Sequence, residues 1–173
     1  MTQKTALQVL LSIGLVAVWV FGVPLSAGAE TLSYKSYVWM NKYDPVVVDE
    51  ATALRVSLAQ RGGIYVCDTG EVATIQRVSL NEFTKEMGTA TIYETIKFPD
   101  GSTILLKGQT VLRQAGGQTT SDQGTTEILK GTGRFAGIKG TGKYANKFLP
   151  ADKGDAGSKQ YGEGTITYTL PPK

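Results

Sequence analysis

Short runs of β-favouring residues alternate with turn signals from Leu54 to the end of the chain. The runs are rich in β-branched and aromatic residues, and glycine stands in most of the breaks between them. They predict eight strands, at residues 53–60, 63–67, 71–84, 89–98, 103–113, 124–134, 137–148 and 160–170. Arg61-Gly62-Gly63, Asp68-Thr69-Gly70 and Pro99-Asp100-Gly101 are predicted turns, because glycine readily adopts the positive φ of tight hairpins. The spacing is typical of an up-and-down antiparallel sheet.

The alternation of side chains predicts which face of the sheet is buried. In the run 160–170, Ile166, Tyr168 and Leu170 share one face, and three threonines share the other. This pattern is typical of a sheet with one face on a core. Because no core helix is predicted to cover that face, the sheet is expected to close on itself. The predicted fold is all-β: a single antiparallel, eight-stranded, calycin-like barrel over residues 53–173, with an interior either filled by side chains or open to one small ligand.

The first 29 residues have the layout of a secretory signal peptide. Lys4 precedes an apolar stretch from Leu7 to about Val23, and Ala27 and Ala29 form a small-residue cleavage site. We therefore predict cleavage after Ala29, a secreted or periplasmic protein, and no stable membrane anchor after processing. The competing interpretation is a retained anchor, because the stretch approaches the length that spans a bilayer.

Residues 30–52 are predicted as an N-terminal extension whose structure stays open. Pro45-Val46-Val47-Val48 favours a strand, whereas Glu50 to Leu58 could form a single helical turn. The segment also carries Tyr34, Tyr37, Trp39, Met40 and Tyr43. These side chains either plug the barrel or bind a partner, and we favour burial because aromatics at this density rarely stay exposed.

Composition and charge exclude several classes of function. The chain has no histidine, which removes imidazole-based nucleophile activation, His-ligated zinc and the usual haem ligand, and we expect no metal and no cofactor. The formal net charge is +3 and the basic residues are dispersed, so we expect no nucleic-acid partner. Cys67 is the only cysteine and lies in a strand-like run, where a packed structural thiol is favoured over a reactive one.

Glu94 breaks the alternation in the run 89–98. Ala90, Ile92, Ile96 and Phe98 form the apolar face of this run, and Glu94 falls on the same face. A buried carboxylate must be paired, protonated or next to a wet cavity, so Glu94 is a candidate ligand-binding residue. Tyr65 and Tyr93 are further candidates, because either hydroxyl could lie beside it, although plain packing is the favoured role of aromatics in strands. The alternative is a register break, or an ion pair with a buried arginine such as Arg77 or Arg113.

The glycine-rich segment 131–144 superficially matches phosphate-binding motifs. Gly137 to Lys143 fits the spacing GxxxxGK, but Tyr144 follows where a Walker A loop needs Ser or Thr, and no helix is predicted after it. We therefore expect no nucleotide partner. Glycines within strands instead permit the sharp coiling of a barrel corner.

The same segment carries a family resemblance. The stretch 131–144, Gly162-Glu-Gly-Thr-Ile-Thr-Tyr-Thr-Leu-Pro171, Asp100-Gly-Ser-Thr-Ile104 and Gly70-Glu-Val-Ala73 resemble the allene oxide cyclase-like barrel group, including exported bacterial members of uncertain function. The resemblance covers about residues 53–171. It implies an eight-stranded barrel with a cavity for an apolar small molecule, and it does not imply cyclisation, because no local motif fixes the positions of the plant enzyme's pocket residues.

Three hypotheses of function follow. The leading one is a barrel that binds a small apolar ligand. The second is a cofactor-free isomerase or cyclase, in which a carboxylate and a tyrosine or water move a proton. The third is a structural or interaction protein of the cell envelope with a filled barrel.

Overall fold

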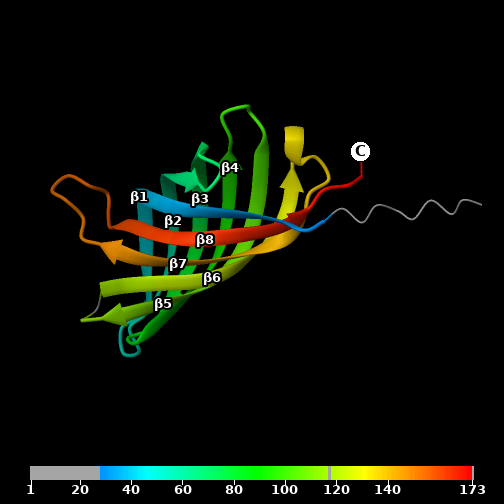
Figure 1. Ribbon diagram of the computed structural model, residues 1–173. Coiled ribbons are helices and arrows are strands. Elements are labelled where there is room, and N and C mark those ends of the chain that lie inside the picture. Colours follow the sequence, from blue (N-terminus) through cyan, green and yellow to red (C-terminus); the bar gives the residue numbers. More distant parts are fainter. Residues whose placement is uncertain (1–27, 117, 173) are drawn as a thin grey trace, which may run out of the picture.

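The computed structural model describes residues 28–116 and 118–172. In this part of the chain, eight strands form one closed antiparallel barrel, in which each strand pairs with its neighbour in sequence and β8 pairs with β1 (Figure 1). The elements are β1 (Glu30–Asp49), β2 (Leu54–Cys67), β3 (Val72–Phe83), β4 (Met87–Lys97), β5 (Thr103–Ala115), β6 (Gln118–Gly131), the 3-10 turn η1 (Gly133–Phe135), β7 (Lys139–Leu149) and β8 (Lys159–Thr169). The predicted eight-stranded antiparallel barrel is thus confirmed.

The predicted signal peptide lies outside the described residues, apart from its last two positions. Within residues 28–116 and 118–172, the chain has no helix of the length and apolarity needed to cross a membrane.

Residues 30–52 are not an extension outside the barrel, because most of this segment is a barrel strand. β1 runs through Glu30–Asp49 and pairs with both β2 and β8. Of the two alternatives left open, the strand at residues 45–48 is confirmed, and the helical turn over residues 50–58 is wrong, because β2 begins at Leu54.

The inward positions of β1 include the buried Tyr34 and Val38. The expected burial of Tyr37, Trp39 and Tyr43 is wrong, because these side chains are 37–38% exposed. Apolar residues on both faces hide the alternation that would have identified the strand.

The predicted turn at Arg61-Gly62-Gly63 is also wrong, because β2 runs through it without a break. A side chain at Gly63 would place its Cβ 2.6 Å from the carbonyl oxygen of Tyr37 on β1. Glycine is therefore needed here for close approach of two strands. Two predicted strands merge into β2, and β1 restores the number to eight.

Inward-facing side chains divide the barrel interior into three layers along its axis. A large apolar cluster fills the end that carries η1, and it includes Phe98, Phe135, Ile138, Ile96 and Ile166. A smaller apolar cluster, made by Phe83, Ala90, Ile92, Leu112 and Tyr144 with Phe148 packed against it, lies toward the opposite end. Buried polar side chains lie between the two: Ser36, Arg61, Arg77, Glu94, Asp122, Asn146 and Gln160.

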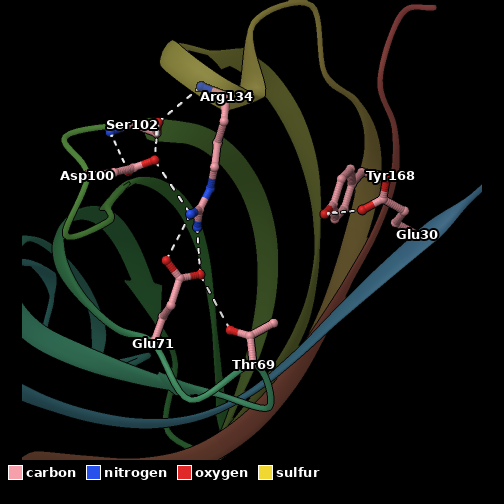
Figure 2. A network of polar contacts seen from close by, with 7 residues as sticks. All are labelled: Glu30, Thr69, Glu71, Asp100, Ser102, Arg134 and Tyr168. Atoms are coloured by element: carbon pink, nitrogen blue, oxygen red, sulfur yellow. Dashed lines mark hydrogen bonds and ion pairs between the residues drawn. The ribbon is translucent and has the colours of Figure 1, made fainter.

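The end with η1 is closed by an arginine that spans two turns. Arg134 donates two hydrogen bonds to the Glu71 carboxylate, at 2.8 and 2.6 Å, and its Nη1 lies 3.5 Å from Asp100 (Figure 2). Its guanidinium also lies 4.8 Å from the ring centroid of Phe98 and 4.9 Å from that of Phe135. The start of β1 and the C-terminal residues lie at this same end, whereas the β7–β8 loop lies at the other (Figure 1). Ligand access to the interior is therefore expected at the end with the β7–β8 loop.

Candidate functional site: a cavity at the open end of the barrel

Glu94 lies inside the barrel and its carboxylate is fully engaged by protein groups. It is 2% exposed, and its Oε1 accepts a hydrogen bond from the Tyr65 hydroxyl at 2.5 Å. Its Oε2 accepts one from Nε of Arg77 at 2.6 Å, which makes a buried ion pair with a side chain that is 4% exposed. Of the alternatives for Glu94, the ion pair with Arg77 is therefore the one present in the structure. Arg113 lies exposed on the outer face.

The prediction that the Tyr93 hydroxyl could lie beside Glu94 is wrong. Successive residues of a strand point to opposite faces of the sheet. Tyr93 is accordingly on the outside of the barrel and 41% exposed. Tyr65, by contrast, is 1% exposed, and its ring stacks on that of Tyr34 at 3.9 Å between centroids.

The charges of this layer are set by burial and by mutual attraction. Burial, the largest single influence, disfavours the charged form of Arg77, but Glu94 together with Tyr65, Tyr144 and Asp122 outweighs it, so that the pKa of Arg77 lies well above its usual value. Burial and the Glu94 carboxylate raise the pKa of the Tyr65 hydroxyl well above 10, so Tyr65 stays protonated and acts as a donor. The trio links three neighbouring strands, β2, β3 and β4, and Tyr65 and Arg77 both keep their protons at neutral pH.

A second set of polar contacts continues the layer across β1, β6, β7 and β8. Asn146 donates to Asp122 at 2.7 Å and accepts from the Ser36 hydroxyl at 3.1 Å. Gln160 accepts from Arg77 at 3.3 Å and donates to Asp122 at 3.4 Å. Burial raises the pKa of the Asp122 carboxyl, and the nearby Arg77 partly opposes this rise. These contacts separate the filled half of the barrel from the half that opens to solvent.

A cavity of about 600 Å³ lies at the open end, above this polar layer, and is called the mouth cavity below. The volume is in the range of pockets that hold small molecules. Its apolar walls include Phe83, Leu112 and Phe148 from the inner faces of three strands, and its rim includes residues of the β7–β8 loop. The lining residues are Met40, Tyr43, Arg61, Asn81, Phe83, Leu112, Gln118, Thr119, Thr120, Phe148, Leu149, Pro150, Ala151, Gly157 and Ser158.

Among the described residues of this lining, Arg61 is the charged one. Its side chain is 8% exposed, and its guanidinium lies 5.7 Å from the centroid of the Phe148 ring. Its Nη1 is buried without a hydrogen-bond partner among the described residues. Burial, reinforced by the positive charge of Arg77, lowers the pKa of Arg61 to about 10, so the guanidinium remains charged at neutral pH.

A hollow of similar volume, about 630 Å³, lies elsewhere on the barrel. It spreads over β1, β2, β7 and β8, and its lining includes the exposed residues Lys35, Val66, Lys143 and Glu163. These side chains point outward, so the hollow is a groove on the outer surface. The mouth cavity is the better candidate, because it enters the barrel interior and is walled by side chains of the smaller apolar cluster.

Of the residues that line the mouth cavity, sequence reasoning singles out only Met40 and Tyr43, and it misses Arg61. Arg61 is predicted in a turn, although in an unbroken strand it lies an even number of residues from Tyr65 and Cys67 and therefore points inward with them.

Cys67 is 4% exposed and packs in the large apolar cluster. In the described part of the chain, no three Cys, Asp or Glu side chains are grouped so as to hold a metal ion.

No protein-family model and no curated protein matches the sequence. Among solved structures, the pterocarpan synthase dirigent protein GePTS1 is similar, with a TM-score of 0.47 and 14% identity over 83% of this chain and 92% of that one. The pterocarpan synthase dirigent protein PsPTS1 is similar with a TM-score of 0.47 and 16% identity, over 84% of this chain and 97% of that one. Likeness at these identities concerns the fold alone.

Proposed function

We propose that this protein binds a small, largely apolar molecule in the mouth cavity. The observation that carries the proposal is the contrast between the two halves of the barrel interior. One half is packed with apolar side chains, whereas the other keeps a cavity of about 600 Å³ walled by Phe83, Leu112 and Phe148. Apolar walls with a few polar groups are typical of small-molecule sites.

The alternatives fit this geometry less well. A cofactor-free isomerase or cyclase needs a proton-transferring group next to the substrate. No Asp or Glu is found in the described lining of the mouth cavity, and Glu94 is bound by Tyr65 and Arg77. A barrel that acts only through its surface has no need of an internal cavity, so the envelope-protein alternative leaves this feature unexplained.

The test is binding of N-phenylnaphthylamine, an uncharged probe whose fluorescence rises in apolar surroundings. We expect saturable binding to residues 30–173, and loss of it in Leu112→Trp, which fills the cavity from β5. Leu80→Trp is the matched control, because Leu80 is 57% exposed on the outside of the barrel. Ala151→Trp blocks the rim without altering the core, and so tests the site even if Leu112→Trp fails to fold. Unchanged probe binding in folded Leu112→Trp and Ala151→Trp would overturn the proposal.

Export is a second part of the proposal. β1 begins at Glu30, so cleavage after Ala29 would leave every barrel strand complete. N-terminal sequencing of the protein recovered from its own host is expected to begin at Glu30, and a chain that retains Lys4 would contradict cleavage.

We also retain the resemblance to the allene oxide cyclase-like barrel group as a proposal. The glycine-rich segment that carries it forms the connection from β6 to β7 together with the first part of β7. The position of this segment at the β6–β7 connection supports a resemblance in barrel fold, and it assigns no cyclase activity.

A further inference from the structure

The unpaired guanidinium of Arg61 indicates what kind of molecule the mouth cavity takes. Buried arginine side chains are normally paired, because an uncompensated charge is costly in a poorly solvated site. In the described chain, Arg61 forms no ion pair, and its buried Nη1 has no hydrogen-bond partner. Arg61 nevertheless lines the cavity, and it is only 8% exposed to solvent.

The neighbouring charges do not neutralise Arg61. Arg77 is positive and is itself paired with Glu94. Asp122 is the buried carboxylate whose charge attracts Arg61, but its hydrogen bonds are accepted from Asn146 and Gln160. The described lining of the cavity contributes no Asp or Glu. The floor of the mouth cavity is therefore a positive site below apolar walls.

We propose that the ligand is an apolar molecule that carries one acidic group, and that this group pairs with Arg61. The proposal rests on the proposed function and specifies the ligand class of the same cavity. Planar guanidinium groups bind carboxylates and related oxyanions through parallel hydrogen bonds, and the pair is stronger where water is excluded. The apolar part of the ligand would lie against Phe83, Leu112 and Phe148, between Arg61 and the opening.

A matched pair of probes tests this inference. Anilinonaphthalene sulfonate is N-phenylnaphthylamine with one added sulfonate, so the two differ by the acidic group alone. In the unaltered protein we expect the sulfonate to bind at least about tenfold more tightly, because charge-assisted hydrogen bonds contribute more than neutral ones. The preference should persist at about 0.5 M sodium chloride, since buried pairs are screened far less than surface pairs.

Arg61→Met is the decisive variant, and Arg113→Met is its matched control. Arg113 is exposed, and on β5 it directly follows Leu112, so this variant loses a guanidinium from the outside of the same end. We expect Arg61→Met to lose the sulfonate preference while it still binds the uncharged probe, and Arg113→Met to retain the preference. Arg61→Lys is expected to keep part of it. Arg61→Met should fold, because it replaces an unpaired buried cation by an apolar side chain of similar length.

The outcomes separate this inference from the proposed function. Binding of both probes with equal affinity, or a sulfonate preference that survives Arg61→Met, would overturn the anionic-ligand inference and leave the apolar cavity in place. The proposed function itself, and this inference with it, would be overturned by either of two results. The uncharged probe could fail to bind the unaltered protein, or it could still bind after the cavity is blocked at Leu112 and Ala151.

Discussion

Replacing Glu94 by Gln removes the negative charge that lies 2.6 Å from Nε of Arg77 inside the barrel. Glu94 and Arg77 are 2% and 4% exposed, so water cannot solvate the Arg77 guanidinium in place of the lost carboxylate. The amide also presents an N–H group, whereas Arg77 and the Tyr65 hydroxyl both need an acceptor. The variant therefore contains a buried guanidinium without its ion-pair partner.

The expected loss is a large part of the stability of the barrel. Removing one member of a buried ion pair typically costs about 3–5 kcal/mol. Single domains are stable by about 5–15 kcal/mol in total. For a chain of this size each kcal/mol corresponds to about 2–4 °C in Tm, so Glu94→Gln is expected to lower Tm by about 6–20 °C.

The assay is urea denaturation of residues 30–173, followed by the fluorescence of Trp39. Asp44→Asn is the control, because the Lys42–Asp44 ion pair is 2.8 Å long but its side chains are 60% and 49% exposed. This exposed pair should contribute less than about 1 kcal/mol. The double variant Arg77→Met/Glu94→Gln should recover part of the loss, since no unpaired cation is left. A loss below about 1 kcal/mol in Glu94→Gln would refute the view that Glu94 is the charge that balances Arg77.

Three further predictions concern pH, close packing and the closed end. Burial raises the pKa of Asp122, so the contribution of Asp122 to folding stability should fall as the pH rises from the unfolded value of about 3.9 through the raised folded value, whereas carboxyls with lowered pKa values, such as Asp100, act in the opposite direction; Asp122→Asn should therefore show a more positive slope of stability against pH than the unaltered protein in urea titrations, and equal slopes would contradict this. Gly63→Ala should destabilise the barrel by about 1–3 kcal/mol, because its Cβ would lie 2.6 Å from a carbonyl oxygen; Gly62→Ala should cost less, because it meets a side chain at 3.0 Å, and equal losses in thermal melts would count against this explanation. Phe135→Ala should cost about 3–5 kcal/mol but leave the affinity for N-phenylnaphthylamine unchanged, since Phe135 packs at the end opposite the mouth cavity; a weakened affinity in the folded variant would show that the ends are coupled.

The sequence determined the fold class through alternation and turn chemistry, which are local properties. In β3 and β4, inward and outward residues alternate without a break, so the direction of Glu94 and the position of the turn at Asp100-Gly101 could be inferred from neighbouring residues alone. β1 was not predicted as a barrel strand because Tyr37 and Trp39 place aromatic rings on its outer face and so obscure the alternation. Gly62 and Gly63 were assigned to a turn because the approach of β1, which excludes a side chain there, is a contact between distant parts of the chain.

The candidate site was decided by the tertiary structure. Alternation places Glu94 inside a barrel, but only closure of the sheet brings Tyr65 and Arg77 against it and so converts a candidate ligand-binding residue into a paired one. Arg61, on the same inward face, has no such partner among residues 28–116 and 118–172, because the barrel is open beside it. Whether an inward charge is paired or lines a cavity depends on how far apart the strands of the closed barrel lie. The spacing of residues along one strand does not give these distances between strands.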